Sequence, residues 1–262
     1  MIQIRLLFVL AACRFLETAL ALPDDAAQYT LLSQGHYKHE LVEVTDAPKR
    51  NTTQVLTSFL DLKKLRSYPP LVQVIDDDFL PSLLLDVNWT SSDYATLGNT
   101  LKPKKLQDEP SITLIRPPTP RAVCYSATNL TYTVTLTDPD APSRHDPKWS
   151  EFLHWIATGL VVSDTTGTSC LSRHTLSLTD LKDLVPYHAP SPPKKTGKHR
   201  YVLLVFAPEN GTTGPLHLTK PDGRKHWGYD YHGERVGVRK WAAENRLIPV
   251  AANFVYAQHK KQ

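Results

Sequence analysis

The chain of 262 residues contains no apolar stretch as long as the roughly 20 residues that a transmembrane helix requires. Its formal net charge is only +4. No run of lysine and arginine alternates with aromatic residues, as expected for a nucleic-acid groove. These absences argue against a stable membrane anchor and against a nucleic-acid partner.

Motifs of the common enzyme classes are missing as well. The sequence has no Gly-x-Ser-x-Gly elbow and none of the glycine-rich loops that hold nucleotide phosphates. The short spacing of common zinc ligands is also absent. A metal site of two histidines and an aspartate, or a hydrolase with His154 or His199 as its base, stays open as an alternative. Without an activated nucleophile, the sequence predicts a binding protein with no enzyme activity, no metal and no cofactor.

The first 21 residues have the pattern of a secretory signal peptide. Arg5 precedes the apolar run 6–12, and Ala19-Leu20-Ala21 fits a cleavage site with small residues. We therefore expect the protein to enter the secretory pathway and to be secreted or vacuolar. Residues 22–52 are expected to form an N-terminal arm, followed by a single domain over residues 53–258.

Cysteine is scarce, with three residues in the chain. Cys13 would leave with the signal peptide, and Cys124 and Cys170 would remain. In an oxidising compartment these two can form a disulfide, while two buried free thiols are the equal alternative. Four Asn-x-Thr sequons predict glycosylation of an exported protein, at Asn51, Asn88, Asn129 and Asn210.

The pattern of apolar residues predicts a mostly β domain. Tyr132, Val134 and Leu136 alternate with threonines over 130–137, and this segment is the clearest strand. Irregular spacing without a βαβ rhythm favours an antiparallel sheet or sandwich. Further strands are expected over 83–89, 111–115, 152–162, 200–207 and 248–256, helices from 53 to about 66 and from 238 to about 246, and loops over 185–197 and 208–233.

Several residues with chemical potential fall at strand ends. Asp138 and Asp140 lie in a proline-rich turn after the strand 130–137, and His199 and Tyr201 share one face of their strand. If three of the expected strands are neighbours, these residues and His154 meet at one end of the sheet. A carboxylate beside an imidazole raises the pKa of the imidazole and fixes its tautomer. Imidazole and tyrosine donors arranged in this way suit a phosphate or carboxylate ligand. An ordinary turn and core histidines are the alternative interpretation.

Separated motifs in the same order resemble the phosphatidylethanolamine-binding protein family. The motifs are Gly98-Asn99, Asp138-Pro-Asp-Ala-Pro-Ser-Arg144, Glu151-Phe-Leu-His-Trp155, Gly197-Lys-His-Arg-Tyr201 and the ending 247–254. The resemblance covers roughly residues 54–258. It implies a large central antiparallel sheet, a smaller sheet, and peripheral and C-terminal helices.

The resemblance also implies a ligand pocket. It would bind a phosphate or an anionic headgroup through Asp138, Asp140, Pro142, His154, His199 and Tyr201, with Phe152 as an aromatic wall. The signal peptide and the loop 187–193 are most similar to exported or vacuolar fungal members of the family. That similarity implies inhibition of a serine carboxypeptidase. A headgroup-binding or scaffold protein without a protease partner is the alternative.

Overall fold

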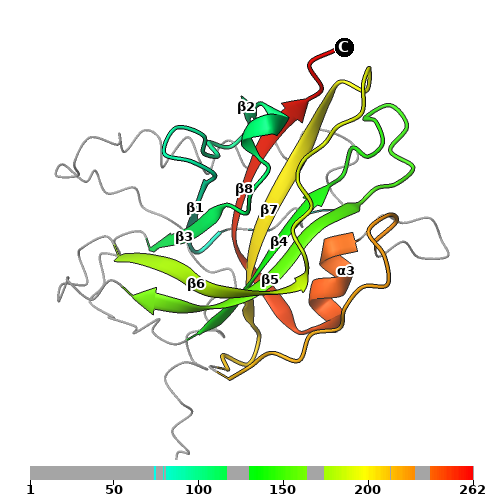
Figure 1. The fold of residues 1–262 in the computed structure, drawn as a ribbon. Helices are drawn as coiled ribbons and strands as arrows, with labels where there is room; N and C mark the ends of the chain where they lie inside the picture. The colour runs from blue at the N-terminus through cyan, green and yellow to red at the C-terminus, as the bar shows by residue number, and fades with distance from the viewer. Residues whose placement is uncertain are drawn as a thin grey trace, which may run out of the picture.

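Segments with alternating or wholly apolar sequence assemble into one sheet in the computed structural model (Figure 1). The structure describes residues 74, 79, 81–116, 130–163, 174–212, 214–227 and 237–261. The elements are β1 (Leu84–Asn88), β2 (Asn99–Leu101), the short 3-10 helix η1 (Pro103–Lys105), β3 (Ser111–Arg116), β4 (Thr131–Asp138), β5 (Phe152–Ser163), β6 (His174–Val185), β7 (Lys198–Pro208), α3 (Gly237–Glu244) and β8 (Leu247–Gln258).

Several predictions fall outside the described residues. They concern the signal peptide and arm over 1–52, the helix from 53 to about 66, the sequons at Asn51 and Asn129, and the pair Cys124 and Cys170.

The sheet has eight strands in the order β1-β3-β6-β5-β4-β7-β8-β2. Its neighbours are antiparallel, except that β2 runs parallel to β8. The prediction of a mostly β fold with a large sheet is confirmed. Every described strand belongs to this sheet, so within these residues the expected smaller sheet is part of the large one.

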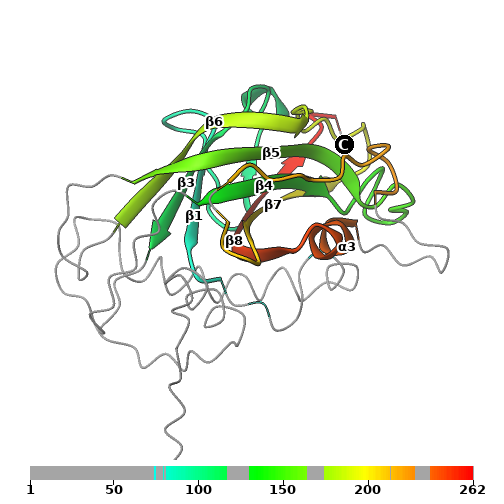
Figure 2. The same ribbon diagram turned by 90° about the horizontal axis from the view of Figure 1, so that it is seen from below.

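The sheet curls until its first strand reaches β8 (Figure 2). The backbone N–H groups of Ser82 and Leu83 both donate to the carbonyl of Val250 at 3.0 Å. The side-chain amide of Asn253 on β8 donates to the carbonyl of Leu85 at 2.7 Å. These contacts bring the β1–β3 edge over the central strands. The curl therefore encloses a core on its concave side.

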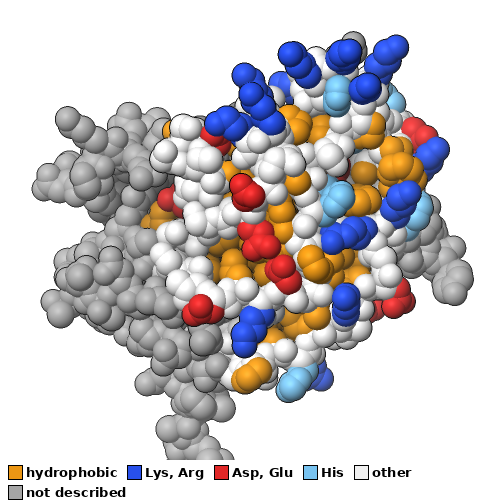
Figure 3. Space-filling view, viewed as in Figure 1, with side chains coloured by type: hydrophobic (Ala, Val, Ile, Leu, Met, Phe, Trp, Pro, Cys, Tyr) orange, Lys and Arg blue, Asp and Glu red, His pale blue; other side chains and the backbone are white. Residues whose placement is uncertain are grey.

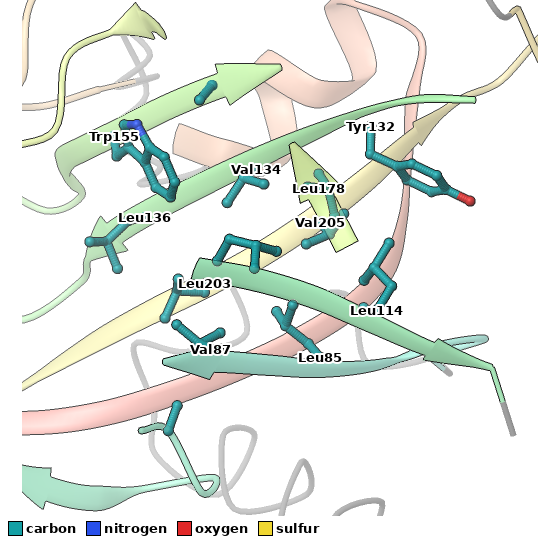
Figure 4. Packing of buried hydrophobic residues seen from close by; sticks show 14 of the residues in the cluster. Leu85, Val87, Leu114, Tyr132, Val134, Leu136, Trp155, Leu178, Leu203 and Val205 are labelled. Carbon is teal, nitrogen blue, oxygen red and sulfur yellow. The ribbon is translucent and has the colours of Figure 1, made fainter. Parts of the chain in front are cut away.

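Apolar side chains from opposite parts of the curled sheet fill that concave side (Figure 4). Leu85 and Leu114 from the β1–β3 edge belong to the same cluster as Val134, Trp155 and Leu203 of the central strands. A second cluster lies where α3 packs, with Val238 and Trp241 among its members (Figure 2). The central strands β4 and β7 are therefore buried on both faces, and the ends of these rigid strands carry the candidate site.

Candidate functional site

The polar residues expected to meet do come together where β4 ends and β5 and β7 begin. These strands are neighbours in the sheet. Asp138 pairs with Phe152 on β5, and Thr137 pairs with Val202 on β7, which places Tyr201 beside Asp138. The hypothesis of one shared strand end therefore agrees with the observed topology.

A β-bulge at the start of β5 positions His154. Leu136 pairs with Trp155, whereas Thr137 pairs with Leu153, so His154 has no opposite residue on β4. Bulges of this kind redirect side chains and are frequent beside binding sites. Two hydrogen bonds join His154 to the loop after β6. The backbone N–H of His188 donates to the carbonyl of His154 at 2.8 Å, and Nδ1 of His154 lies 2.6 Å from the carbonyl oxygen of His188.

This contact fixes the chemical form of the His154 ring. A carbonyl only accepts, so the proton lies on Nδ1 and Nε2 is left as an acceptor. Burial is the main reason why the pKa of His154 falls to about 3, and the charges of Arg224 and other neighbours lower it further. His154 is therefore neutral at ordinary pH, and its Nε2 is able to accept a hydrogen bond but not to donate one.

Asp138 and His199 form the buried polar centre of the site. Nδ1 of His199 lies 2.8 Å from Oδ2 of Asp138, and Oδ1 of Asp138 accepts the backbone N–H of Asp140 at 2.8 Å. The other ring nitrogen of His199 lies 2.9 Å from the hydroxyl of Thr196. Burial raises the pKa of Asp138, and the hydrogen bond from His199 opposes this rise. Burial also raises the pKa of Tyr201, and the nearby carboxylates of Asp138 and Asp140 raise it further.

Asp140 lies behind this centre in a salt bridge. Nε and Nη2 of Arg200 donate to its two oxygens, and the backbone N–H of Arg200 donates to Oδ2 at 2.9 Å. Nη2 of Arg144 lies 3.6 Å from the same oxygen. Asp140 is 0% exposed and Arg200 is 1% exposed. In this arrangement Asp140 holds the turn against β7, while Asp138 is the carboxylate nearer to the histidines.

Aromatic rings line the site beside these polar groups. The ring of Phe152 lies 4.9 Å from that of His154 and 5.6 Å from that of His188, measured between centroids. Tyr201 meets His154 edge to face at 5.2 Å. Phe152 therefore stands where an aromatic wall was expected. Pro142 is half-buried in the turn after β4 and follows a cis peptide bond.

Three residues around the site were not predicted from the sequence. His188 and Thr196 belong to the proline-rich loop before β7, and Arg224 comes from the long loop after it. Nη1 of Arg224 donates to the carbonyl of His154 at 2.9 Å, and Nη2 donates to the carbonyl of Pro186 at 2.7 Å. Arg224 thus ties the bulge to the loop that carries His188. In the sequence, the only feature that pointed to these residues was the unusual proline content of the loop that carries His188 and Thr196.

Glu151 links the site to α3. Thr137 donates its hydroxyl hydrogen to Oε2 of Glu151 at 2.8 Å, and the backbone N–H of Val238 donates to Oε1 at 3.4 Å. The residue is completely buried, and burial raises its pKa to about 8. Phe152 follows Glu151 directly in the chain. The buried Glu151 therefore connects the first turn of α3 with the segment that carries the Phe152 ring.

The remaining site predictions concern the surface and bound ions. Of the two sequons within the described ranges, Asn210 is exposed in the turn after β7 and Asn88 is half-buried at the end of β1. Among the described residues, no group of three His, Cys, Asp or Glu side chains could hold a metal ion. No helix in the same part of the chain is long and apolar enough to cross a membrane.

Known proteins share both the sequence and the fold. The chain is 35% identical over 196 residues to the carboxypeptidase Y inhibitor of Saccharomyces cerevisiae, covering 71% of this chain and 88% of the relative. A CEN-like protein from Nicotiana tabacum is 29% identical over 185 residues, which cover 70% of this chain and 86% of the relative. A relative that is named as an inhibitor supports the prediction of a binding protein rather than an enzyme.

Solved structures also share the fold of this chain. A carboxypeptidase Y inhibitor complexed with its cognate proteinase aligns with a TM-score of 0.64 and 31% identity, over 78% of this chain and 96% of the inhibitor. A phosphatidylethanolamine-binding protein from Plasmodium vivax, 19% identical, shares the fold with a TM-score of 0.55, over 78% of this chain and 98% of that chain. Residues 91–255 match the sequence pattern of the family described as phosphatidylethanolamine-binding protein. The chain belongs to this family.

Proposed function

We propose that this protein is an exported inhibitor of a serine carboxypeptidase and that its pocket binds a phosphate or an anionic headgroup. The observation that carries the first part is the similarity to an inhibitor over nearly its whole length, in sequence and in structure. A fold shared across the family does not by itself indicate a common partner, so the inhibitor relative is the specific argument.

Inhibition is tested by titrating the purified protein against carboxypeptidase Y and following hydrolysis of a peptide substrate. We expect saturable inhibition with one inhibitor bound per enzyme. A folded protein that leaves the hydrolysis rate unchanged at every concentration would contradict this function. It would leave a headgroup-binding or scaffold protein as the better interpretation.

The pocket supports the second part of the proposal through its mixture of groups. His154 offers an acceptor nitrogen, and His199 offers its Nε2 once a ligand replaces the hydroxyl of Thr196 as its partner. A ligand that has both a charged oxygen and a hydrogen-bond donor matches this set, as does a phosphate monoester or a headgroup with an ammonium group. The ring of Phe152 provides a favourable contact for such a cation.

Pocket binding is tested by calorimetry with inorganic phosphate and with glycerophosphoethanolamine. His199→Ala is expected to weaken binding of both ligands. His217→Ala serves as the matched control, because His217 is exposed in the loop that packs near α3. Equal affinity of the two variants would refute the pocket assignment. If His199→Ala still inhibits carboxypeptidase Y, the pocket and the inhibitory surface are separate.

Export is tested at Asn210, whose exposed side chain lies in a sequon. A protein that passes through the secretory pathway of a yeast host should carry a glycan at this position. Asn210→Gln should then increase its mobility on a denaturing gel by the mass of one glycan. Unchanged mobility, together with retention of residues 1–21 at the N-terminus, would contradict export.

A further inference from the structure

The loop after β6 fixes the imidazole ring of His154 in one tautomer. Nδ1 of His154 lies 2.6 Å from the carbonyl oxygen of His188, and the backbone N–H of His188 donates to the carbonyl of His154 at 2.8 Å. The other tautomer would place the lone pair of Nδ1 against that carbonyl oxygen, which has no hydrogen to offer. Nε2 is therefore kept in the form that only accepts.

Arg224 holds the two partners of this contact together. Its Nη1 donates to the carbonyls of Leu153 and His154 at 3.0 and 2.9 Å, and its Nη2 donates to the carbonyl of Pro186 at 2.7 Å. One guanidinium thus bonds both to the bulge at the start of β5 and to the loop that carries His188. The ammonium of a lysine is a single point and does not reproduce this fork.

The ring of His154 also resists a second proton, which would turn Nε2 into a donor. The side chain is 3% exposed, and burial is the main reason why its pKa is about 3. The charge of Arg224 lowers this pKa further, and the hydrogen bond to His188 only partly opposes the fall. At ordinary pH the nitrogen therefore remains an acceptor.

The surrounding charge does not distinguish one anion from another. Lys and Arg side chains gather at the end of the sheet where β8 ends (Figure 3), and Lys194, Lys195 and Lys198 lie in the same segment as Thr196 and His199. Clustered charges of one sign raise the local concentration of every anion. A preference between anions of equal charge must therefore come from hydrogen bonds within the site.

We propose that His154, locked by His188 and Arg224, makes the site selective for anions that carry a proton. An acceptor nitrogen pairs with an oxygen that bears hydrogen, as in hydrogen phosphate, and opposes a fully ionised oxygen, as in sulfate. A site built around one hydrogen bond rejects the ligand that cannot make it. The inference rests on the proposed phosphate binding. In it, His154 determines specificity and Arg224 is a positioning residue.

The experiment compares inorganic phosphate with sulfate by calorimetry at about pH 8, where the two tetrahedral anions have nearly equal charge and only phosphate retains a proton. His154→Gln introduces an amide that either accepts or donates, and Arg224→Lys keeps the charge without the fork. Lys225→Gln is the control, because Lys225 is exposed and its Nζ lies 4.0 Å from the centre of the Trp149 ring. Thermal unfolding shows which variants are folded.

We expect the unmodified protein to bind phosphate at least about tenfold more tightly than sulfate, since an unpaired buried polar group is costly. His154→Gln should bring the ratio of the two affinities close to one. Arg224→Lys should lower the ratio about threefold or more, because His188 is then held less firmly and the other tautomer of His154 becomes accessible. Lys225→Gln should weaken both anions alike and leave the ratio unchanged.

Nitrogen NMR of the His154 imidazole gives a second readout that a loss of stability alone does not change. The proton should lie on Nδ1 in the unmodified protein and in Lys225→Gln, whereas Arg224→Lys should show both tautomers. A proton on Nε2 in the unmodified protein would refute the role of His154. If Arg224→Lys keeps the original ratio and the proton on Nδ1, Arg224 is not the positioning residue.

The two anions also separate this inference from the function on which it rests. Equal affinity of the unmodified protein for phosphate and sulfate would overturn the selectivity and leave the proposed phosphate binding intact. A folded protein that binds neither anion would refute the phosphate binding itself, and the selectivity with it.

Discussion

Nδ1 of His199 lies 2.8 Å from Oδ2 of Asp138, and both side chains are almost completely buried. The hydroxyl of Thr196 donates to the carbonyl of Pro193 at 2.8 Å, so it accepts a hydrogen from Nε2 of His199 on its other side. Asp138 on one side and Thr196 on the other therefore both contact the imidazole. These two contacts fix the orientation of the His199 ring.

Asp138→Asn is expected to weaken phosphate binding. The amide keeps the shape of the side chain but removes the charged acceptor that lies 2.8 Å from Nδ1 of His199. Hydrogen bonds to a charged group are roughly twice as strong as neutral ones, so a less firmly held His199 should bind phosphate about tenfold more weakly. Calorimetry with inorganic phosphate measures it, with His217→Ala as the control. An affinity equal to that of the unmodified protein would show that His199 does not depend on Asp138.

Thr196→Val tests whether an internal hydrogen bond competes with the ligand. Valine has the shape of threonine but leaves Nε2 of His199 without its present partner. We expect phosphate affinity to rise about fivefold, since one intramolecular hydrogen bond contributes about 1 kcal/mol. Thr196→Ser should change little because it keeps the hydroxyl. A lower affinity of the valine variant would instead make the hydroxyl a ligand contact.

Most strands and the C-terminal helix could be predicted because their apolar patterns reflect the faces that they bury. The strand β6 could not. It carries three exposed charged residues, Asp180, Lys182 and Asp183, and its pairing with β5 shifts register twice. The strand β2 has only three residues and no buried side chain, so its sequence holds too little pattern.

The candidate site was predictable where it depends on strand ends. Asp138, His199 and Tyr201 each stand at a fixed position relative to a clear strand. The neutral form of His154 was not predictable, because it depends on a bulge and on the carbonyl of His188 in a distant loop. Loop residues such as Thr196 and Arg224 have no periodic pattern and acquire their role only from tertiary contacts.

Glu151 is expected to make the protein less stable as pH rises. Its pKa is about 8 in the folded state and near its usual 4.5 in the unfolded chain, so the folded state binds the extra proton. The free energy of unfolding contributed by this group is complete below pH 4.5 and is lost as pH rises to about 8. Glu151→Gln should therefore flatten the decline between pH 6.5 and 8, measured by urea denaturation.

His154 has the opposite effect at lower pH. Its pKa falls from 6.5 to about 3 on folding, so the unfolded chain binds the extra proton and stability is lost as pH falls from 6.5 towards 3. Between pH 4.5 and 6.5 the slopes from His154 and Glu151 cancel. We expect a plateau of stability in that range in the unmodified protein. A maximum above pH 8 would contradict these two assignments.

Asp140→Asn tests the salt bridge between Asp140 and Arg200. The substitution leaves the guanidinium of Arg200 buried without a negative partner, and breaking a buried pair in this way costs about 3–5 kcal/mol. Urea denaturation should show this loss in the free energy of unfolding. Asp146→Asn is the matched control, because Asp146 and Lys148 are exposed and 3.7 Å apart, and such surface pairs contribute about 0–1 kcal/mol.

The same variant separates a structural role of Asp140 from ligand contact. Both oxygens of Asp140 accept hydrogen bonds from Arg200, so a ligand in front of Asp138 and His199 finds this carboxylate occupied. We therefore expect the phosphate affinity of Asp140→Asn, at a temperature where it is folded, to stay within about threefold of that of the unmodified protein. A change of this size is smaller than the effect of losing one hydrogen bond to a charged group. If affinity falls as far as in Asp138→Asn while the free energy of unfolding is unchanged, Asp140 contacts the ligand directly and the salt bridge is not its main function.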